Sequence, residues 1–300
     1  MNIVITGATG FIGSHLVKHF LKFNNYKIKI LIKKGKKSEI FADTNIEIIK
    51  TNFSYSELLN VFIGVDQIVH LAGVRMPRSI KYVNIDYFYD ANIKLIENIL
   101  IAANKCNVRR ITMSSSIAVY GDIIKSEYIS ENNMLNPINN YGLSKLIGEQ
   151  LMYQFSKNTS IETVSLRFSQ IFGIGEKANL IIQNFIDKCL KGEDIMIYPN
   201  GFQKRDYLYI LDVLNAIETV INQDSMNGCY NIGSNIAYSA YEIAEIIKEE
   251  LNSPSKIIIS KSRHSFNKIV MDISKFQKET RWNPRWTLRE SIRDMISCIN

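Results

Sequence analysis

The sequence predicts an α/β protein built on a doubly wound parallel sheet that helices cover on both faces. Two observations support this prediction. Short apolar runs alternate with amphipathic segments in the first half of the chain, and a glycine-rich turn follows the first of those runs. Because parallel strands need crossover connections that are usually helical, this alternation is typical of an open parallel sheet.

The expected strands are short and rich in isoleucine and valine, as strands buried on both faces are. Segments with helical periodicity separate several of them, such as "GSHLVKHFLKF" and "KLIENILIAANK". The strand-like runs are residues 2–6, 27–33, 46–50, 67–73, 110–116 and 162–168, and later helical patterns cover residues 179–191, 212–222, 239–251 and 287–299.

The rhythm of the sequence changes after about residue 169, where helical patterns dominate and strand-like pieces such as "DIMIY" are short. We therefore expect a first domain over residues 1–168 and a smaller C-terminal α/β lobe over residues 169–300. No proline- or glycine-rich linker separates the two, so this boundary is approximate and allows segments to interleave.

Composition excludes several classes of protein. The chain has 300 residues, and no apolar run approaches the roughly 18 residues of a membrane span. The N-terminus "MNIVITG" lacks the basic segment of a secretory signal. The four cysteines lie far apart, which argues against a metal site or a disulfide framework and favours a reducing cytoplasm. They are Cys106, Cys189, Cys229 and Cys298.

The net charge of +7 has its densest basic run at residues 33–37, "KKGKK". This run suggests nucleic-acid binding, but no nucleic-acid motif accompanies it and lysines are spread over the whole chain. We favour a solvated turn, and anionic small molecules are an equally good use for the charge.

The turn "TGATGFIGSHL" (residues 6–16) follows the first strand and leads directly into an amphipathic helix. Glycine is needed where a backbone turns sharply and approaches a pyrophosphate, and a helix N-terminus attracts anions. This context predicts a Rossmann-type dinucleotide site. The residues expected at the phosphates are Gly7, Gly10, Phe11, Ile12 and Gly13.

The end of the second strand bears on the choice of dinucleotide. Folds that use NAD usually place Asp or Glu there for the ribose 2′-hydroxyl, whereas a basic residue can accept the 2′-phosphate of NADP. Lys33 and Lys34 occupy this place. The residues therefore favour NADP over NAD, although lysine is a less decisive phosphate partner than arginine.

Several motifs in order resemble those of the extended short-chain dehydrogenase/reductases, and more narrowly their NAD-dependent epimerase/dehydratase branch, the nucleotide-sugar epimerases. The resemblance runs along nearly the whole chain. It is carried by the glycine turn and by "GVDQIVHLAG" (64–73), "RRITMSSSIAVYG" (109–121), "NPINNYGLSKLIGEQ" (136–150), "SLRFSQIFGIG" (165–175), "GFQKRDYLYILDV" (201–213) and "YNIGS" (230–234).

The resemblance implies roles for individual residues. Ser116 would bind the reacting hydroxyl, Tyr141 would be the acid/base, and Lys145 would hold the nicotinamide ribose and lower the tyrosine pKa. Tyr and Lys four positions apart share one helix face. Further cofactor contacts are expected from Asn52, Phe53, Leu71, Ala72, Gly73, Asn92 and Ser114. Substrate contacts are expected from Ser116, Gln170, Asn179, Arg205 and Arg263.

The chain also departs from the family pattern. Ile117 and Ala118 follow the serine where the family's 4,6-dehydratases carry Asp-Glu, which argues against that elimination. Asn52 stands where many relatives have an Asp, and Gln170 replaces an Asn.

The resemblance implies a cytoplasmic nucleotide-sugar 4-epimerase with tightly bound NAD, of the kind that serves cell-surface polysaccharide biosynthesis. A second hypothesis is an NADPH-dependent 4-keto-sugar-nucleotide reductase of deoxysugar biosynthesis, which the basic end of the second strand favours. A third is a non-catalytic cofactor sensor, although both Tyr141 and Lys145 are present. The family often dimerises through two helices of the cofactor domain, so a homodimer is expected, with no nucleic acid, membrane or metal as partner.

Overall fold

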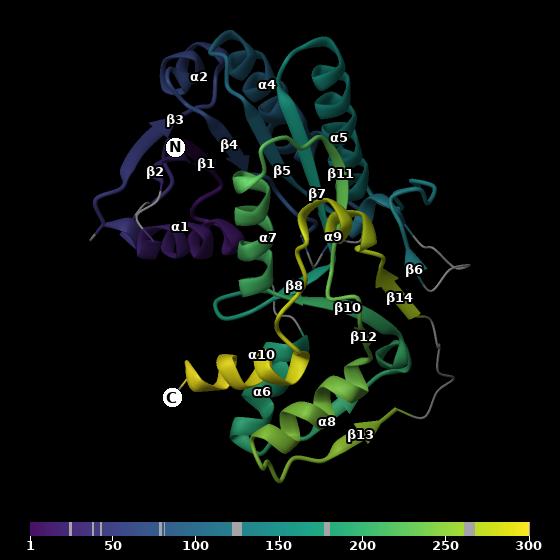
Figure 1. Cartoon of the computed structure of the whole chain (residues 1–300). Coiled ribbons are helices and arrows are strands. Elements are labelled where there is room, and N and C mark those ends of the chain that lie inside the picture. The colour runs from purple at the N-terminus through teal and green to yellow at the C-terminus, as the bar shows by residue number, and fades with distance from the viewer. Residues whose placement is uncertain are drawn as a thin grey trace. The chain divides into compact units, whose positions relative to one another are not determined.

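The computed structural model describes every residue except 24–25, 38, 43, 78–79, 81, 122–127, 177–180, 261–267 and 300. The chain divides into two compact units (Figure 1). The first unit comprises Met1–Asp122, Asn132–Arg167 and Leu214–Tyr230, and the second comprises Ile123–Glu131, Phe168–Val213 and Asn231–Asn300. The chain thus crosses between the units several times, and the change near residue 168 is one of these crossings.

The first unit is built around a sheet of seven strands, as far as the described residues extend, in the order β11-β7-β5-β4-β1-β2-β3. Neighbouring strands from β3 to β5 pair in parallel. The strand order reverses next to β1, which is where open α/β sheets bind their ligands. The strands are β1 (Asn2–Thr6), β2 (Lys27–Lys33), β3 (Glu47–Thr51), β4 (Gln67–His70), β5 (Arg110–Ser116), β7 (Glu162–Phe168) and β11 (Gly228–Ile232).

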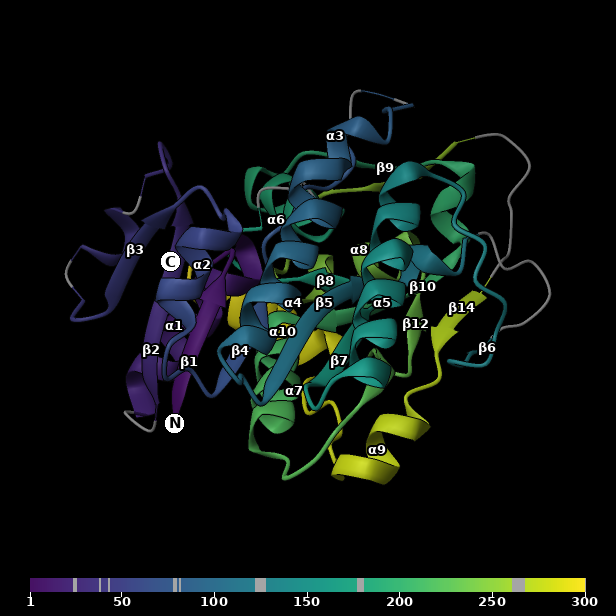
Figure 2. The same ribbon diagram turned by 90° about the horizontal axis from the view of Figure 1, so that it is seen from above.

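Helices cover both faces of this sheet, so the predicted doubly wound fold is confirmed. Helices α2, α4 and α5 pack in a row over one face (Figure 2). Helix α1 lies on the other face beside α7, to which His19 is tied by a 2.8 Å contact with Glu218 (Figure 1). The helices are α1 (Phe11–Phe23), α2 (Tyr55–Phe62), α4 (Leu95–Lys105), α5 (Asn140–Asn158) and α7 (Ile210–Asn222).

Short irregular turns connect the larger elements of the first unit. They are the 3-10 turns Glu39–Phe41 and Ile117–Val119, the short helix α3 (Asp86–Phe88) and a π-helical turn, Tyr89–Lys94. The expected strand over residues 67–73 is shorter in the structure, because β4 ends at His70. Residues 71–73 leave the sheet and pass over the glycine turn.

The second unit is a smaller mixed α/β body. Strands β12, β10, β14 and β6 form one sheet in that order, with β8 paired to β10, and β13 pairs with β9. These strands are β6 (Tyr128–Ile129), β8 (Gln170–Phe172), β9 (Ile195–Ile197), β10 (Lys204–Tyr209), β12 (Ala237–Tyr238), β13 (Ile257–Ile259) and β14 (Lys268–Met271). The helical segments are α6 (Ile181–Lys191), a 3-10 turn (Pro199–Phe202), α8 (Ala240–Glu250), α9 (Ser274–Thr280) and α10 (Leu288–Ser297).

Capping residues define where two of the expected helices begin. Ser239 and Glu242 form a capping box at the start of α8, and Thr287 and Glu290 form another at the start of α10. Each box satisfies backbone N–H groups that the first helical turn leaves without partners. None of the helices in the described part of the chain combines the length and apolar character that a membrane crossing requires.

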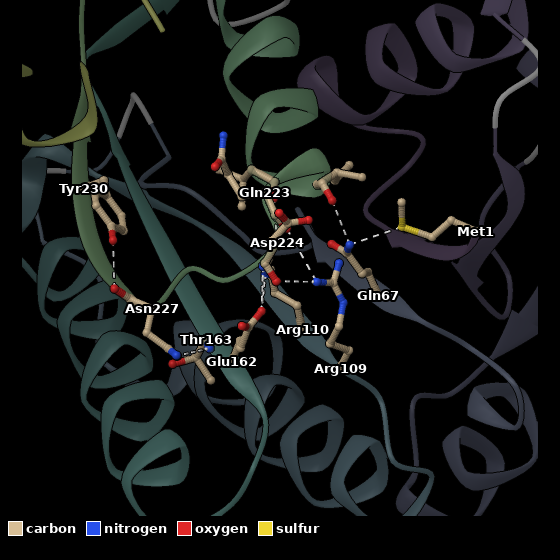
Figure 3. A network of polar contacts seen from close by, with 12 residues as sticks. Met1, Gln67, Arg109, Arg110, Glu162, Thr163, Gln223, Asp224, Asn227 and Tyr230 are labelled. Atoms are coloured by element: carbon tan, nitrogen blue, oxygen red, sulfur yellow. Dashed lines mark hydrogen bonds and ion pairs between the residues drawn. The ribbon is translucent and has the colours of Figure 1, made fainter. Parts of the chain in front are cut away.

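A polar network joins the C-terminus of α7 to the first residues of the central strands β4 and β5 (Figure 3). The fully buried Arg110 donates to the Val220 carbonyl and, at 2.7 Å, to the Glu162 carboxylate. Gln67 donates to the Ile221 carbonyl at 2.8 Å. The last carbonyls of a helix lack intrahelical donors and carry partial negative charge, so cationic and amide donors stabilise this end.

We predict that Arg110→Met lowers the free energy of unfolding by roughly 3–5 kcal/mol, because it leaves Glu162 and a helix carbonyl without their buried donor. Chemical denaturation measures the loss. Lys29→Met is the control, since Lys29 forms a 3.4 Å pair with Glu47 that is largely exposed and should cost at most about 1 kcal/mol. Equal losses in the two variants would contradict the prediction.

Candidate active site

The glycine turn is too tightly packed for side chains at two of its glycines. Gly7 has a φ of +73°, and a Cβ there would lie 2.4 Å from the Ala72 nitrogen. A Cβ on Gly13 would lie 2.2 Å from the Gly7 carbonyl oxygen. The turn therefore brings bare backbone and the N-terminus of α1, with Phe11 and Ile12, to one place. This arrangement fits the diphosphate of a dinucleotide.

The loop after β4 is held against this turn. The Leu71 amide donates to the Thr6 carbonyl at 3.2 Å, and the Ala72 amide donates to the Thr6 hydroxyl at 3.3 Å. A Cβ on Gly73 would lie 2.9 Å from the Asn92 side-chain oxygen and 3.6 Å from Lys145 Nζ. The expected cofactor residues 71–73 thus lie between the glycine turn and Lys145.

Asn92 is buried in the π-helical turn, a feature that often occurs at functional sites. Its oxygen accepts from the Val74 amide at 2.8 Å, and its nitrogen donates to the Val74 carbonyl at 3.0 Å and to Ser144 Oγ at 2.9 Å. Asn92 therefore lies at the site, and its amide joins the loop after β4 to α5.

The structure brings Ser116, Tyr141 and Lys145 together at the carboxyl end of β5. Ser116 and Tyr141 form a side-chain hydrogen bond. Lys145 Nζ donates to the Ser114 carbonyl at 2.9 Å. One helix face and one strand end thus present the three predicted catalytic side chains and Ser114.

The residues around Tyr141 explain how α5 comes so close to β5. The Asn139 side chain caps the helix by accepting from the Gly142 amide at 2.9 Å. A Cβ on Gly142 would lie 2.4 Å from the Ala118 carbonyl oxygen. Because only glycine fits at position 142, the segment "NNYGLSK" determines how closely the helix approaches β5 as well as which functional groups it carries.

Burial dominates the electrostatics of the site. It lowers the pKa of Lys145 to about 8, an effect that the Glu149 carboxylate opposes. Burial and then the Lys145 charge lower the pKa of His70 to about 3, so His70 is a neutral partner of the Thr6 hydroxyl. The lysine charge is therefore close to the β4 end and incompletely solvated.

Burial also raises the pKa of Tyr141 above its ordinary value, while the Ser116 hydrogen bond and the Arg75 charge lower it. Arg75 was not among the predicted site residues. The lowering of the Tyr141 pKa by Lys145 stays a prediction.

A buried network behind the site was also missed by the sequence analysis. Glu149 accepts from Ser115 Oγ at 2.5 Å and from Arg167 at 2.7 Å. Arg167 also donates to the Tyr120 hydroxyl at 2.8 Å. Burial opposes the charge on Arg167, yet the hydrogen bonds to Glu149 hold its pKa above the ordinary value. The spacing Tyr141, Lys145, Glu149 on one helix face was the available signal.

The ends of β2 and β3 carry the other expected cofactor residues. Lys33 is exposed at the last position of β2, and Lys34 forms a 2.6 Å ion pair with Glu57. The backbone N–H of Asn52 also donates to Glu57. Phe53 has a φ of +62°, unusual for a bulky residue, and its carbonyl accepts from Asn98 at 3.0 Å.

Of the substrate residues expected beyond the first unit, the structure describes Gln170 and Arg205, and both lie in the second unit. Gln170 is exposed and pairs with Tyr207, two residues beyond Arg205 on the neighbouring strand β10. Arg205 donates to the Gln203 side chain at 2.6 Å and to the Lys204 carbonyl at 3.1 Å. Asn179 and Arg263 lie outside the described residues.

The described residues contain no group of three or more His, Cys, Asp or Glu side chains that could hold a metal ion.

Comparison with known proteins agrees with this geometry. Residues 3–233 match the model of the NAD dependent epimerase/dehydratase family. A putative UDP-glucose 4-epimerase of Methanocaldococcus jannaschii is 32% identical, with 98% of this chain and 97% of that protein covered. An uncharacterized UDP-glucose epimerase of Bacillus subtilis is 27% identical, with 100% and 98% covered. A UDP-N-acetylglucosamine 4-epimerase from Methanobrevibacter ruminantium, solved with UDP-N-acetylmuramic acid, is 26% identical with a TM-score of 0.85, and 99% and 98% of the chains are covered.

We predict that Glu149→Gln lowers the free energy of unfolding by roughly 3–5 kcal/mol, because Arg167 loses its buried counter-charge. It also moves the Lys145 pKa further below about 8, since the carboxylate that favours the ammonium form is gone. Chemical denaturation measures the first effect, and NMR titration of labelled lysine measures the second.

The control is Ser115→Ala, which removes one hydrogen bond to Glu149 and keeps its charge. It should cost only about 1–3 kcal/mol and should leave the Lys145 titration near its original pH. A Lys145 pKa that is unchanged in Glu149→Gln would contradict the electrostatic part of the prediction.

Proposed function

Because the chain belongs to the NAD dependent epimerase/dehydratase family, we propose that it is an NAD-dependent nucleotide-sugar 4-epimerase. The observation that carries the proposal is the convergence of Ser116, Tyr141 and Lys145 beside a glycine turn that fits a diphosphate. The names of the relatives as 4-epimerases of UDP-sugars support the same reaction.

The proposed cofactor residues follow from their places at the sheet edge. The glycine turn, with Phe11 and Ile12, would hold the diphosphate, and Asn52 and Phe53 would lie toward the adenosine. Lys145 would hold the nicotinamide ribose beside Ser114, whose carbonyl already accepts from it. NAD supplies a reversible hydride acceptor when bound, which is the one chemical capability that these side chains lack.

Tyr141 is the proposed proton carrier. It removes the proton of the sugar C4 hydroxyl as the carbon is oxidised to a 4-keto sugar, and it returns the proton when the carbon is reduced from its other face. Ser116 would orient the C4 hydroxyl of the sugar by a hydrogen bond. In the structure the Ser116 side chain is hydrogen-bonded to Tyr141. Burial raises the pKa of Tyr141, so the charge of Lys145 is needed to make the tyrosinate accessible near neutral pH.

The residues after Ser116 support epimerisation over elimination. Ile117 and Ala118 form the 3-10 turn that directly follows β5. Their hydrocarbon side chains cannot exchange protons with a substrate, so this turn supplies no acid or base for removing a second hydroxyl. A 4-epimerase needs none, because Tyr141 both accepts and returns the only proton exchanged.

We propose that the second unit contributes the nucleotide-sugar contacts through Gln170 and Arg205. The two residues lie close together on paired strands, and a guanidinium is suited to a pyrophosphate. Asn179 and Arg263 are proposed for the same role from the sequence alone.

The reductase alternative depended on free lysine charge at the end of β2. Lys34 is instead paired with Glu57, which weakens the case for a reaction that uses NADPH. A non-catalytic sensor would have no use for a Tyr141 and Lys145 pair held together with Ser116.

We further propose that the reaction takes place in the cytoplasm and supplies sugars for cell-surface polysaccharide. Cys106, Cys189, Cys229 and Cys298 form no disulfide in the described part of the chain, which suits a reducing compartment.

A homodimer that forms through α4 and α5 is proposed as well. Ile101 on α4 and Leu143 and Tyr153 on α5 are 38–50% exposed, so these neighbouring helices both present large apolar side chains to solvent. Light scattering should give the mass of two chains, and Ile101→Glu with Tyr153→Glu should give one. Ile63→Glu, at the residue that follows the last turn of α2, is the control and should leave the dimer intact. A wild-type monomer would refute the interface.

The proposed function predicts that the purified protein interconverts two C4-epimeric UDP-hexoses with no net consumption of cofactor. Tyr141→Phe should slow turnover by about 10²–10⁴-fold, the usual contribution of general acid–base catalysis, and should still bind NAD. Tyr153→Phe, three turns along the same helix, should retain full activity.

Chromatography of the two sugars and calorimetric titration with NAD measure these outcomes. Stoichiometric oxidation of added NADPH by a 4-keto-sugar nucleotide would instead support the reductase. Full activity in Tyr141→Phe would refute the role of Tyr141.

A further inference from the structure

A carboxylate occupies the corner where β2 and β3 end. Glu57 lies in the first turn of α2, and its side chain reaches back over both strand ends. One carboxylate oxygen accepts from Lys34 Nζ at 2.6 Å. The other accepts from the Thr51 hydroxyl at 2.8 Å and from the backbone N–H of Asn52 at 2.7 Å.

These three donors fix the position and the charge of Glu57. The hydrogen bond from Lys34 is the main cause that lowers the Glu57 pKa to about 2, and Thr51 and Asn52 add to it. The side chain is therefore ionised at neutral pH. A carboxylate offers about four acceptor positions, so one remains for a further donor. The side chain is 31% exposed, which leaves it accessible to a ligand.

The corner lies next to the glycine turn. Strand β2 pairs with β1, with Thr6 opposite Leu31, and with β3, with Lys33 opposite Thr51. In doubly wound folds, the group at the end of the second strand meets the adenosine ribose of a bound dinucleotide. An acid there accepts a hydrogen bond from the 2′-hydroxyl of NAD, whereas a cation there accepts the 2′-phosphate of NADP.

We infer that Glu57 makes this chain select NAD over NADP, because it places a fixed carboxylate where β2 itself supplies only lysines. The 2′-hydroxyl can donate to the remaining acceptor position of Glu57. A 2′-phosphate would meet a fixed negative charge, and Lys34 would have to leave its ion pair to compensate it. The inference rests on the proposed function, since it requires a dinucleotide at the glycine turn.

This selectivity is the reverse of the preference that the basic end of β2 suggested. The sequence shows Lys33 and Lys34 at the strand end, while Glu57 lies more than twenty positions later on another element. The Glu57 carboxylate reaches the end of β2 only because α2 packs so that its first turn lies next to the ends of β2 and β3.

The test compares the dissociation constants of NAD and NADP in wild type, Glu57→Gln and Glu47→Gln. Protein stripped of bound nucleotide is titrated calorimetrically with each dinucleotide. Wild type should bind NAD more tightly, and Glu57→Gln should raise NADP affinity relative to NAD by about tenfold, equivalent to ~1.4 kcal/mol. Retained NAD binding shows that the variant is folded.

Glu47→Gln is a matched control, because Glu47 also pairs with a lysine of β2. Its partner is Lys29 at 3.4 Å, at the opposite end of the same two strands. The variant makes the same change in net charge and should leave the NAD-to-NADP ratio within about twofold of wild type.

A second variant assigns the gain to the released lysine. Adding Lys34→Met to Glu57→Gln should remove most of the increase in NADP affinity. The inference is overturned if wild type prefers NADP, or if Glu57→Gln leaves the ratio unchanged while NAD still binds. Failure of wild type to bind either dinucleotide would overturn the proposed function and this inference together.

Discussion

The buried ion pair between Glu149 and Arg167 is the interaction on which the arrangement of the candidate site depends. It joins α5 to β7, and Ser115 ties the same carboxylate to β5 between Ser114 and Ser116. The helix face that carries Tyr141 and Lys145 is thereby held against the strand end that carries the serines. A buried pair of this kind contributes little net stability against an apolar replacement, but losing one member is costly, so it enforces one packing.

Close backbone contacts are the second constraint. Gly7 and Gly13 let the first turn fold onto itself and onto the loop after β4, and Gly142 lets α5 approach the turn after β5. In each case a Cβ would lie within 2.4 Å of a backbone atom, which no side-chain adjustment can relieve. The glycines therefore determine how near the proposed phosphate site and the proposed proton carrier come to their supporting strands.

Two carboxylates that were not predicted as site residues, Glu149 and Glu57, act on the charge of the site at both ends. Burial lowers the pKa of the Lys145 ammonium group, and the Glu149 carboxylate opposes that shift. Glu57 neutralises Lys34 at the far corner of the sheet edge. The basic composition of the chain thus gives little guidance to local potential, since individual lysines meet fixed acids that other elements supply.

The sequence by itself determined most strands of the first unit, the glycine turn and the helix face shared by Tyr141 and Lys145, because local periodicity and backbone requirements are written in adjacent residues. Only the tertiary structure decided that β1 lies between β2 and β4, that Arg167 neutralises Glu149, and that Glu57 lies at the end of β2. Those pairings join residues on different elements, and their energies arise only when burial removes water from both partners. Local patterns therefore reveal which groups the chain carries, and packing decides which of these groups form ion pairs.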